Sequence, residues 1–347
     1  MRKLLYGVVA LVLALAAVAA FMYYTPAGQD ALFSRAAQAV MGQGPPAPEG
    51  LRVVVCGSAS PAGNDPERAQ ACIAVLTPEH FFLVDVGARS PMRIAQARLP
   101  MGRLDGVLLT HFHSDHIAGL ADVNLASWVQ GRRSSLNVHG PKGVGVVVAG
   151  FNLAYSLDQG YRVAHHGPEL LAPPAGPMTA VEFSPGDVVW EDDLMTIRAF
   201  PVDHAPIDPA VGYRVDYRGR SVVISGDTNA VESLFAAAQG ADLLLHDALS
   251  RTLIDPMIEA TRAAGLPALP TILTDVIDYH ADSLSIEARA AEAGIRQLAY
   301  YHLVPVPANA LAERMFARGL SPDTLLVRDL HTFDLLPDST DIHIREP

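Results

Sequence analysis

The chain has 347 residues, half of them hydrophobic, and a formal net charge of −12. This length allows one large domain or two medium ones with a substantial buried core. An acidic chain with only two lysines, Lys3 and Lys142, repels phosphate backbones, which disfavours broad nucleic-acid binding. The two cysteines, Cys56 and Cys72, are too few for a disulfide-rich scaffold or a cysteine-rich metal site.

An uncharged apolar segment, Leu4 to Met22, follows Arg2 and Lys3 at the N-terminus. Its length just spans a bilayer core, and the two tyrosines that follow it suit the membrane interface. An uncleaved anchor over residues 1–26 fits these features better than a signal peptide cleaved near Ala17–Ala19, and a buried soluble helix fits them least. With an anchor or a signal peptide, the positive flank stays in the cytoplasm and the rest of the chain is exported.

Residues 27–50 are predicted to link this segment to the body of the protein, residues 51–347. Within the linker, Gln29 to Met41 can form a short helix, and Gly42 to Gly50 is rich in proline and glycine. The body begins with β-branched and apolar runs that predict three strands and then a helix, at Leu51–Cys56, Ala71–Leu76, Phe81–Val86 and Pro91–Leu99.

The two cysteines fall on consecutive predicted strands, Cys56 on the first and Cys72 on the second. In an oxidising compartment they could form a disulfide. Two buried thiols are the alternative, and the sequence leaves both open.

Three histidines and one aspartate then occur within six residues: His111, His113, Asp115 and His116. They follow the apolar run Gly106–Leu109, which predicts a buried strand with the cluster on the loop at its end. Imidazoles and carboxylates are the ligands that zinc and similar divalent metals prefer. The first two histidines alternate and can face one point, while the Asp-His pair at the turn can face a second. One loop could therefore serve two metals, and a polar loop with incidental histidines is the alternative.

Strands and helices alternate along the remainder of the chain, which predicts sheets covered by helices. The predicted strands lie at Val138, Leu194–Pro201, Gly212–Tyr217, Ser221–Ile224, Leu243–Leu245 and Gln297–Tyr301, with helices after Gly143 and over Val231 onward and Ser283–Ala293. A proline-rich segment over Tyr161–Met178 is predicted to form an excursion or a lid. His165 and His166 in it could contact substrate, and a solvent-exposed pair is the favoured alternative.

Further candidate ligands stand just after apolar runs: Asp227, His246 and His302, with His204 following another run across Pro201. A rigid sheet aims the residues at its strand ends into one cavity. A single histidine in such a place is more often a structural residue that forms hydrogen bonds. Together with the first cluster, however, these residues supply enough ligands for two metals.

The cluster at His111–His116 resembles the HxHxDH motif of the metallo-β-lactamase fold, and the chain is most similar to the ribonuclease Z-like branch. The resemblance covers Leu51 to Pro307. Around the cluster, the family's other motifs occur in order at Cys56–Pro61, Asp85–Gly87, His139–Pro141, His204, Gly212–Arg214, Ser225–Thr228 and His302.

The resemblance implies an αββα sandwich with two divalent metal ions at one edge, zinc most often, with manganese or iron as alternatives. The matching metal positions are His111, His113 and His204 for the first metal, Asp115, His116 and His302 for the second, and Asp227 as the bridge. Two such ions would lower the pKa of a shared water and give a bridging hydroxide for attack on the substrate.

The resemblance also implies catalytic roles. Asp115 would accept a hydrogen bond from the hydroxide, and His280 falls where ribonuclease Z-like proteins place a histidine that contacts the scissile group. The match at His280 is looser, because the family more often has His-Ser-Thr there. His246 and Asp247 stand where relatives have His-Glu, and we expect them to orient a metal ligand by hydrogen bonding.

Three features lead us to expect a small-molecule substrate rather than tRNA: export, acidic charge, and a tight turn between Gly212–Arg214 and Ser225–Asp227, where ribonuclease Z has a long arm that grips tRNA. We therefore expect a membrane-anchored, exported hydrolase of a small ester, lactone, phosphodiester or sulfate ester, or a secreted one if a signal peptide is cleaved. A ribonuclease Z-like phosphodiesterase or nuclease is the first alternative, and a non-catalytic metal-binding module of the cell envelope is the second. The family's habits also suggest a homodimer.

Overall fold

The computed structural model describes residues 2–41, 44–63 and 65–347. The chain divides into two compact units, Met1–Pro46 and Ala47–Pro347. The first unit consists of α1 (Arg2–Tyr24) and α2 (Pro26–Met41), so the helix expected within the linker forms and begins three residues earlier than predicted. By length and composition, α1 is the one described helix that could cross a membrane.

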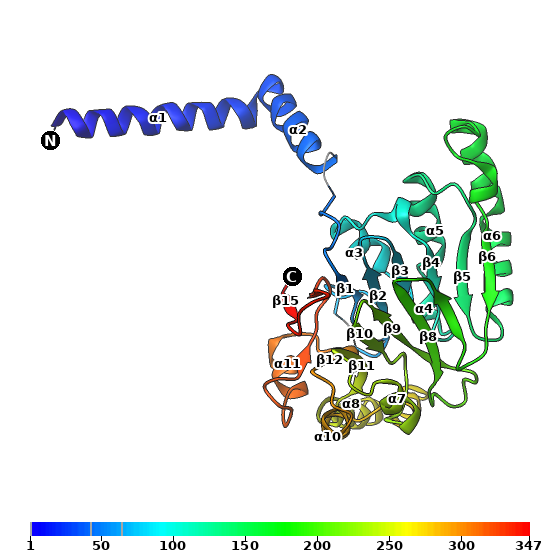
Figure 1. Ribbon diagram of the computed structural model, residues 1–347. Helices are drawn as coiled ribbons and strands as arrows, with labels where there is room; N and C mark the ends of the chain where they lie inside the picture. Colours follow the sequence, from blue (N-terminus) through cyan, green and yellow to red (C-terminus); the bar gives the residue numbers. More distant parts are fainter. Residues whose placement is uncertain (1, 42–43, 64) are drawn as a thin grey trace. The chain divides into compact units, whose positions relative to one another are not determined.

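The second unit contains two sheets (Figure 1). The first sheet has eight strands in the order β15 (His343–Arg345), β14 (Thr332–Leu335), β1 (Leu51–Gly57), β2 (Cys72–Leu76), β3 (Phe81–Val84), β4 (Gly106–Leu108), β5 (Leu136–Gly140) and β6 (Met178–Glu182). The second has seven, in the order β13 (Leu325–Leu326), β12 (Gln297–Val304), β11 (Leu243–Leu249), β10 (Arg220–Ile224), β9 (Val211–Tyr217), β8 (Met195–Pro201) and β7 (Val188–Glu191).

Helices cover the outer face of each sheet. Those that follow strands of the first sheet are α3 (Ser90–Gln96), α4 (Ser114–Ile117), α5 (Leu120–Val129) and α6 (Val144–His166), with 3₁₀ turns at Met101–Arg103 and Pro173–Ala175. Those that follow strands of the second are α7 (Glu232–Ala237), α8 (Arg251–Ala263), α9 (Leu269–Asp275), α10 (Ser283–Glu292) and α11 (Ala310–Phe316), with a 3₁₀ turn at Val276–Asp278.

Strand alternation explains the layers, because successive side chains point to opposite faces of a sheet. On β1, Val53 and Val55 pack between the two sheets against residues such as Ile224 and Leu245 of the second sheet. The intervening Val54 packs outward in the cluster that the helices α3, α5 and α6 cover. The result is the αββα sandwich that the resemblance implies.

Parallel pairing decides where the loops meet. In the first sheet β3, β4, β5 and β6 are parallel neighbours, and in the second β10, β11, β12 and β13 are parallel neighbours. The carboxyl ends of parallel strands lie at the same edge, where α/β proteins place their sites. The loop that carries His111 leaves the first sheet at this edge, and the loop that carries Asp227 leaves the second.

Four predicted elements end elsewhere than expected. The strand predicted over Phe81–Val86 stops at Val84, because Asp85 adopts a left-handed backbone with φ 55°. The predicted lid is helical at its start, since α6 continues to His166. In the second sheet, β11 and β12 run past His246 and His302, so these histidines lie within strands rather than after them.

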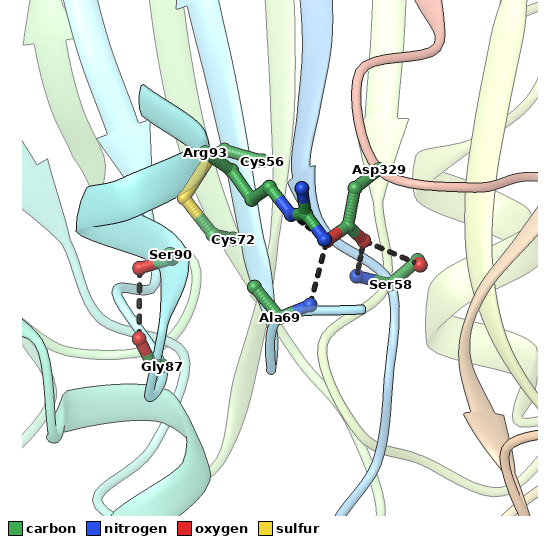
Figure 2. The surroundings of a disulfide bond; sticks show 8 residues. All are labelled: Cys56, Ser58, Ala69, Cys72, Gly87, Ser90, Arg93 and Asp329. Atoms are coloured by element: carbon green, nitrogen blue, oxygen red, sulfur yellow. Dashed lines mark hydrogen bonds and ion pairs between the residues drawn. A yellow bond between two sulfur atoms is a disulfide. The ribbon is translucent and has the colours of Figure 1, made fainter. Parts of the chain in front are cut away.

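The two cysteines form a disulfide between the adjacent antiparallel strands β1 and β2, and both are fully buried. Figure 2 shows the carboxylate of Asp329 close by, where it accepts hydrogen bonds from the backbone amides of Ser58 and Ala69 and from Nε of Arg93. The disulfide and this buried carboxylate together fasten the segment that runs from β1 toward Ser60. The disulfide alternative is confirmed, and the chain has no free cysteine.

Replacing the cysteines should destabilise the fold. A disulfide that closes a loop with a sequence separation of 16 residues contributes about 3 kcal/mol by restricting the unfolded chain. We expect Cys56→Ala, Cys72→Ala and the double variant to lose similar amounts in denaturant unfolding, since each removes the same bond. The prediction would be wrong if the stability losses of the two single variants added up in the double variant. It would also be wrong if a reductant changed neither the mass nor the stability of the wild type.

Candidate metal centre

Seven histidine and aspartate side chains from both sheets converge at the shared carboxyl edge. They come from the loop after β4 and from α4 (His111, His113, Asp115 and His116), the loop after β8 (His204), the loop after β10 (Asp227) and the strand β12 (His302). All but His113, which is half-buried, are buried. The sequence-predicted ligand set is therefore brought together in space.

The first group consists of three imidazoles and one carboxylate. Nδ1 of His113 lies 3.0 Å from Nε2 of His111 and 3.3 Å from Nε2 of His204. Oδ2 of Asp227 lies 3.9 Å from Nε2 of His111 and 3.9 Å from Nε2 of His204. Four potential ligand atoms thus surround one point.

The second group shares Asp227 with the first. Oδ2 of Asp115 lies 3.0 Å from Nε2 of His302 and 3.4 Å from Nε2 of His116. Nε2 of His116 lies 3.2 Å from Oδ2 of Asp227. The single carboxylate of Asp227 therefore stands between two groups that could each hold a metal ion.

The carboxylate of Asp85, buried behind the cluster, decides which ring nitrogen carries the proton on two of the histidines. The Thr110 hydroxyl donates to Oδ2 of Asp85 at 2.8 Å, so it accepts from Nδ1 of His111 at 3.1 Å. Nδ1 of His116 also donates to Oδ2 of Asp85, at 2.8 Å. In both rings the proton on Nδ1 leaves the Nε2 lone pair for the cluster, the arrangement typical of metal-binding histidines.

His204 follows the same rule with a different partner. Its Nδ1 lies 3.1 Å from the backbone carbonyl of Tyr279, which can only accept, so Nδ1 carries the proton and Nε2 presents its lone pair. The Nε2 lone pairs of His111 and His204 therefore face the Asp227 carboxylate. Nε2 of His116 also lies 3.2 Å from Oδ2 of Asp227, and Nδ1 of His302 lies 3.2 Å from its Oδ1. Imidazole lone pairs that face a buried carboxylate need a cation between them, and this set of nitrogen and oxygen atoms fits divalent metal ions.

The pKa shifts of His116 and Asp227 also show that the site favours positive charge beside its carboxylates. Burial disfavours the charged form of His116, but three carboxylates, that of Asp227 foremost, outweigh it and raise the pKa of His116 well above its usual value. Burial alone would raise the pKa of Asp227, yet His116 and His302 hold it well below the usual range.

Local backbone geometry places two of these residues. Gly226 has φ 65°, and a Cβ there would lie 2.8 Å from the carbonyl oxygen of Val211, so only glycine allows the close turn before Asp227. His302 is the extra residue of a β-bulge: Asp247 pairs with Tyr301 and Ala248 pairs with Leu303. Its φ of 44° turns the imidazole into the site.

A cavity of about 210 Å³ opens onto the second group and is lined in part by His280 and Tyr279. Nδ1 of His280 donates to Oδ2 of Asp247 at 2.7 Å, so Nε2 is the nitrogen available to a bound molecule. Burial alone would raise the pKa of Asp247, but hydrogen bonds from His246 and His280 lower it. This carboxylate therefore stays ionised beside the His280 ring.

His246 and Asp247, which were predicted to orient a metal ligand, form hydrogen bonds with each other and with His280. Asp247 holds His280, and Nδ1 of His246 donates to the Asp247 backbone carbonyl at 2.7 Å. His246 also stacks near Phe235 in the helix α7. The hydrogen bond of the Asp247 side chain reaches the cavity-lining His280, because β11 continues past His246 and turns Asp247 toward the loop that carries His280. A role of His246 and Asp247 in orienting a metal ligand stays a prediction.

His165 and His166 are not brought to the cavity. Both are exposed at the C-terminal end of α6, whose other end begins beside Phe112 in the metal loop. A helix of 23 residues is roughly 34 Å long at about 1.5 Å per residue. The predicted substrate lid is therefore misplaced: the excursion extends the helix away from the site.

The roles of Asp85, Thr110 and Tyr279 were not predicted from the sequence. Asp85 and Thr110 each stand at a strand end, which was the available signal, but nothing in the sequence tells which histidine each would meet. Tyr279 contributes a carbonyl to His204, and its ring packs edge-on against the same imidazole at 5.0 Å.

Asp85→Asn should weaken metal binding without unfolding the protein. An amide in place of the carboxylate accepts the His116 proton less strongly, and loss of such a partner typically costs 10–100-fold in affinity. Chelator competition would measure this, with the exposed Asp122→Asn on α5 as a matched control. Equal affinity in both variants would contradict the orienting role.

Comparison with known proteins agrees with this geometry. A model described as a β-lactamase superfamily domain matches residues 80–302. Ribonuclease Z of Mycobacterium bovis (strain BCG / Pasteur 1173P2) is 34% identical over 293 residues, which cover 83% of this chain and 99% of that protein.

Among solved structures, the short form of human tRNase Z has a TM-score of 0.55 at 17% identity and covers 81% of this chain and 98% of its own. Zn²⁺-bound PqqB from Methylobacterium extorquens has a TM-score of 0.55 at 17% identity, covering 82% and 100%. Both share the fold. From the family model and the ribonuclease Z relatives, the chain belongs to the metallo-β-lactamase superfamily, in its ribonuclease Z-like branch, and is a metal-dependent hydrolase.

Proposed function

We propose that the protein is a phosphodiesterase that works with two divalent metal ions. The observation that carries this is the His280–Asp247 pair, which presents an imidazole to the cavity beside two ligand groups that share Asp227. The similarity to ribonuclease Z over nearly the whole length of that protein supports the same reaction.

In this proposal His111, His113 and His204 hold the first metal, Asp115, His116 and His302 hold the second, and Asp227 bridges them. Nitrogen and oxygen donors suit zinc, with manganese or iron as alternatives. Two such ions, when bound, polarise a phosphoryl oxygen and lower the pKa of water.

The chain's own residues orient the reactants. Asp115 has its carboxylate at the cavity wall, where it accepts a hydrogen bond from the attacking water. His280 donates a proton from Nε2 to the leaving oxygen, and the carboxylate of Asp247 fixes the orientation of its ring. His302 stacks on His280 at a ring distance of 5.5 Å, which keeps the imidazole at the second ligand group.

RNA is the substrate that the relatives favour, since those proteins are named ribonuclease Z. The expectation that nucleic acid is not a partner is therefore weakened. The structure contains the tight hairpin expected from the sequence, since β9 and β10 join directly at Arg218–Gly219. An RNA substrate would therefore bind without an arm at this place. The wider range of esters, lactones and sulfate esters, and a non-catalytic role, have no support from these relatives.

A small phosphodiester outside the cytoplasm is the second candidate. Two observations favour it: α1 suits a membrane crossing, and both cysteines form a disulfide, which persists in oxidising compartments. In this version residues 1–26 anchor the chain, residues 27–50 link it and residues 51–347 form the exported hydrolase, with a cleaved signal peptide as the alternative. Assembly as a homodimer stays a prediction.

His280→Ala and Asp247→Asn should each lower kcat for an unactivated phosphodiester such as a dinucleotide, whose alkoxide leaving group needs a proton, by roughly 100- to 10,000-fold for the loss of a general acid. Metal content should remain at the wild-type value, because neither residue is assigned as a ligand. The double variant His165→Ala/His166→Ala serves as control and should match the wild type. Unchanged kcat in His280→Ala would exclude its role in proton transfer.

Topology separates the two substrate candidates. A phosphatase reporter fused after Pro347 should be active only if the body is exported, and a fluorescent reporter that matures in the cytoplasm should then stay dark. The reverse pattern would exclude the extracytoplasmic candidate and leave RNA as the substrate class to test.

A further inference from the structure

The cavity at the second ligand group has two chemically different sides. One side carries the polar groups Asp115, His280 and His302. The other is apolar and consists of Pro61, Ala62, Val276 and Val304, contributed by the loop after β1, the turn after α9, and β12. Among the described residues that line the cavity, none is lysine or arginine.

The apolar side of the cavity packs against a small hydrophobic core. Val304 is buried, and with Leu249, Ile254 and Leu273 it forms a small core beneath α8 and α9. Ala62 and Val276 pack against this core and still border the cavity. The wall is therefore held in place by packing rather than by a loose loop.

The helix α9 continues the apolar wall out to the surface. Leu269, Ile272 and Val276 are spaced three and four residues apart, so they lie along one face of the helical segment. Val276 borders the cavity, while Ile272 and Leu269 are 53% and 42% exposed. We call Leu269, Ile272 and Val276 the α9 stripe.

We propose that the substrate is a phosphodiester in which one ester group is an alkyl chain, a class of amphiphile; this rests on the proposed phosphodiesterase activity. The phosphoryl group faces the ligand groups, and the chain lies on Val276 and extends along the α9 stripe. The phosphodiester carries one negative charge, and the described residues that line the cavity include no lysine or arginine to pair with the second charge of a monoester.

The reaction is a simple hydrolysis. Water oxygen forms a bond to phosphorus, one phosphorus–oxygen ester bond breaks, and the proton from His280 goes to the leaving oxygen. The products are an alcohol and a phosphate monoester.

The test uses the full chain with its metals in lipid nanodiscs and a series of methyl, butyl and octyl p-nitrophenyl phosphates below their micelle concentrations. Total hydrolysis is counted as nitrophenol plus alkanol by chromatography. Burial of each methylene is expected to raise kcat/KM about two- to fourfold until the chain leaves the stripe. Partition into the nanodisc is the same for all variants, so comparison between variants isolates the effect of the protein.

Ile272→Ser should reduce the ratio of octyl to methyl kcat/KM by about fivefold or more, since it removes most of one exposed apolar contact of the chain. Leu153→Ser on α6, where the side chain is 78% exposed and away from the cavity, is the matched control and should keep the wild-type ratio. Both positions are exposed enough that substitution leaves the core intact.

The outcomes are distinguishable. Absence of hydrolysis for every diester would overturn the proposed phosphodiesterase and this inference with it. Hydrolysis of the methyl diester with no gain for octyl, or a gain that Ile272→Ser leaves unchanged, would overturn the alkyl-chain proposal alone. An RNA oligonucleotide cleaved with a higher kcat/KM than the octyl diester would also overturn it and keep the phosphodiesterase.

Discussion

The site depends on one buried carboxylate, Asp227, placed between two groups of ligand atoms. An unpaired buried charge costs several kcal/mol, so the fold must surround it with positive charge. The surrounding histidines present lone pairs instead, because Asp85 and the Tyr279 carbonyl hold the protons of three rings on the far side. The two sheets, the turn at Gly226 and the β-bulge at His302 thus place ligand atoms around a buried charge that metal ions can neutralise.

The sequence predicted the parts of this arrangement that depend on local spacing. The cluster at His111–His116 is contiguous, and strand ends marked His204 and Asp227, so the ligands could be named before their geometry was known. The αββα layers followed from the resemblance. What could not be predicted depended on strand register and length. His302 enters the site through a bulge, and Asp247 holds His280 because β11 runs four residues further than its apolar run Leu243–Leu245 suggests.

The predicted lid failed for a related reason. Prolines after His166 indicated an irregular excursion, but the helix before them already carries the chain away from the site. The cavity wall comes instead from α9 and its following turn, whose short apolar stripe gives little signal in the sequence. The cavity wall thus depends on packing between distant segments such as Ala62 and Val276, which spacing rules do not reach.

The central claim, that Asp227 serves both ligand groups, is tested most directly by the metal content of single variants measured by elemental mass spectrometry. The wild type should hold two metal ions per chain. Because His204 belongs to one group only, His204→Ala should retain about one ion, whereas Asp227→Ala should lose both. Retention of one or two ions by Asp227→Ala, or a wild type without metal, would contradict the account.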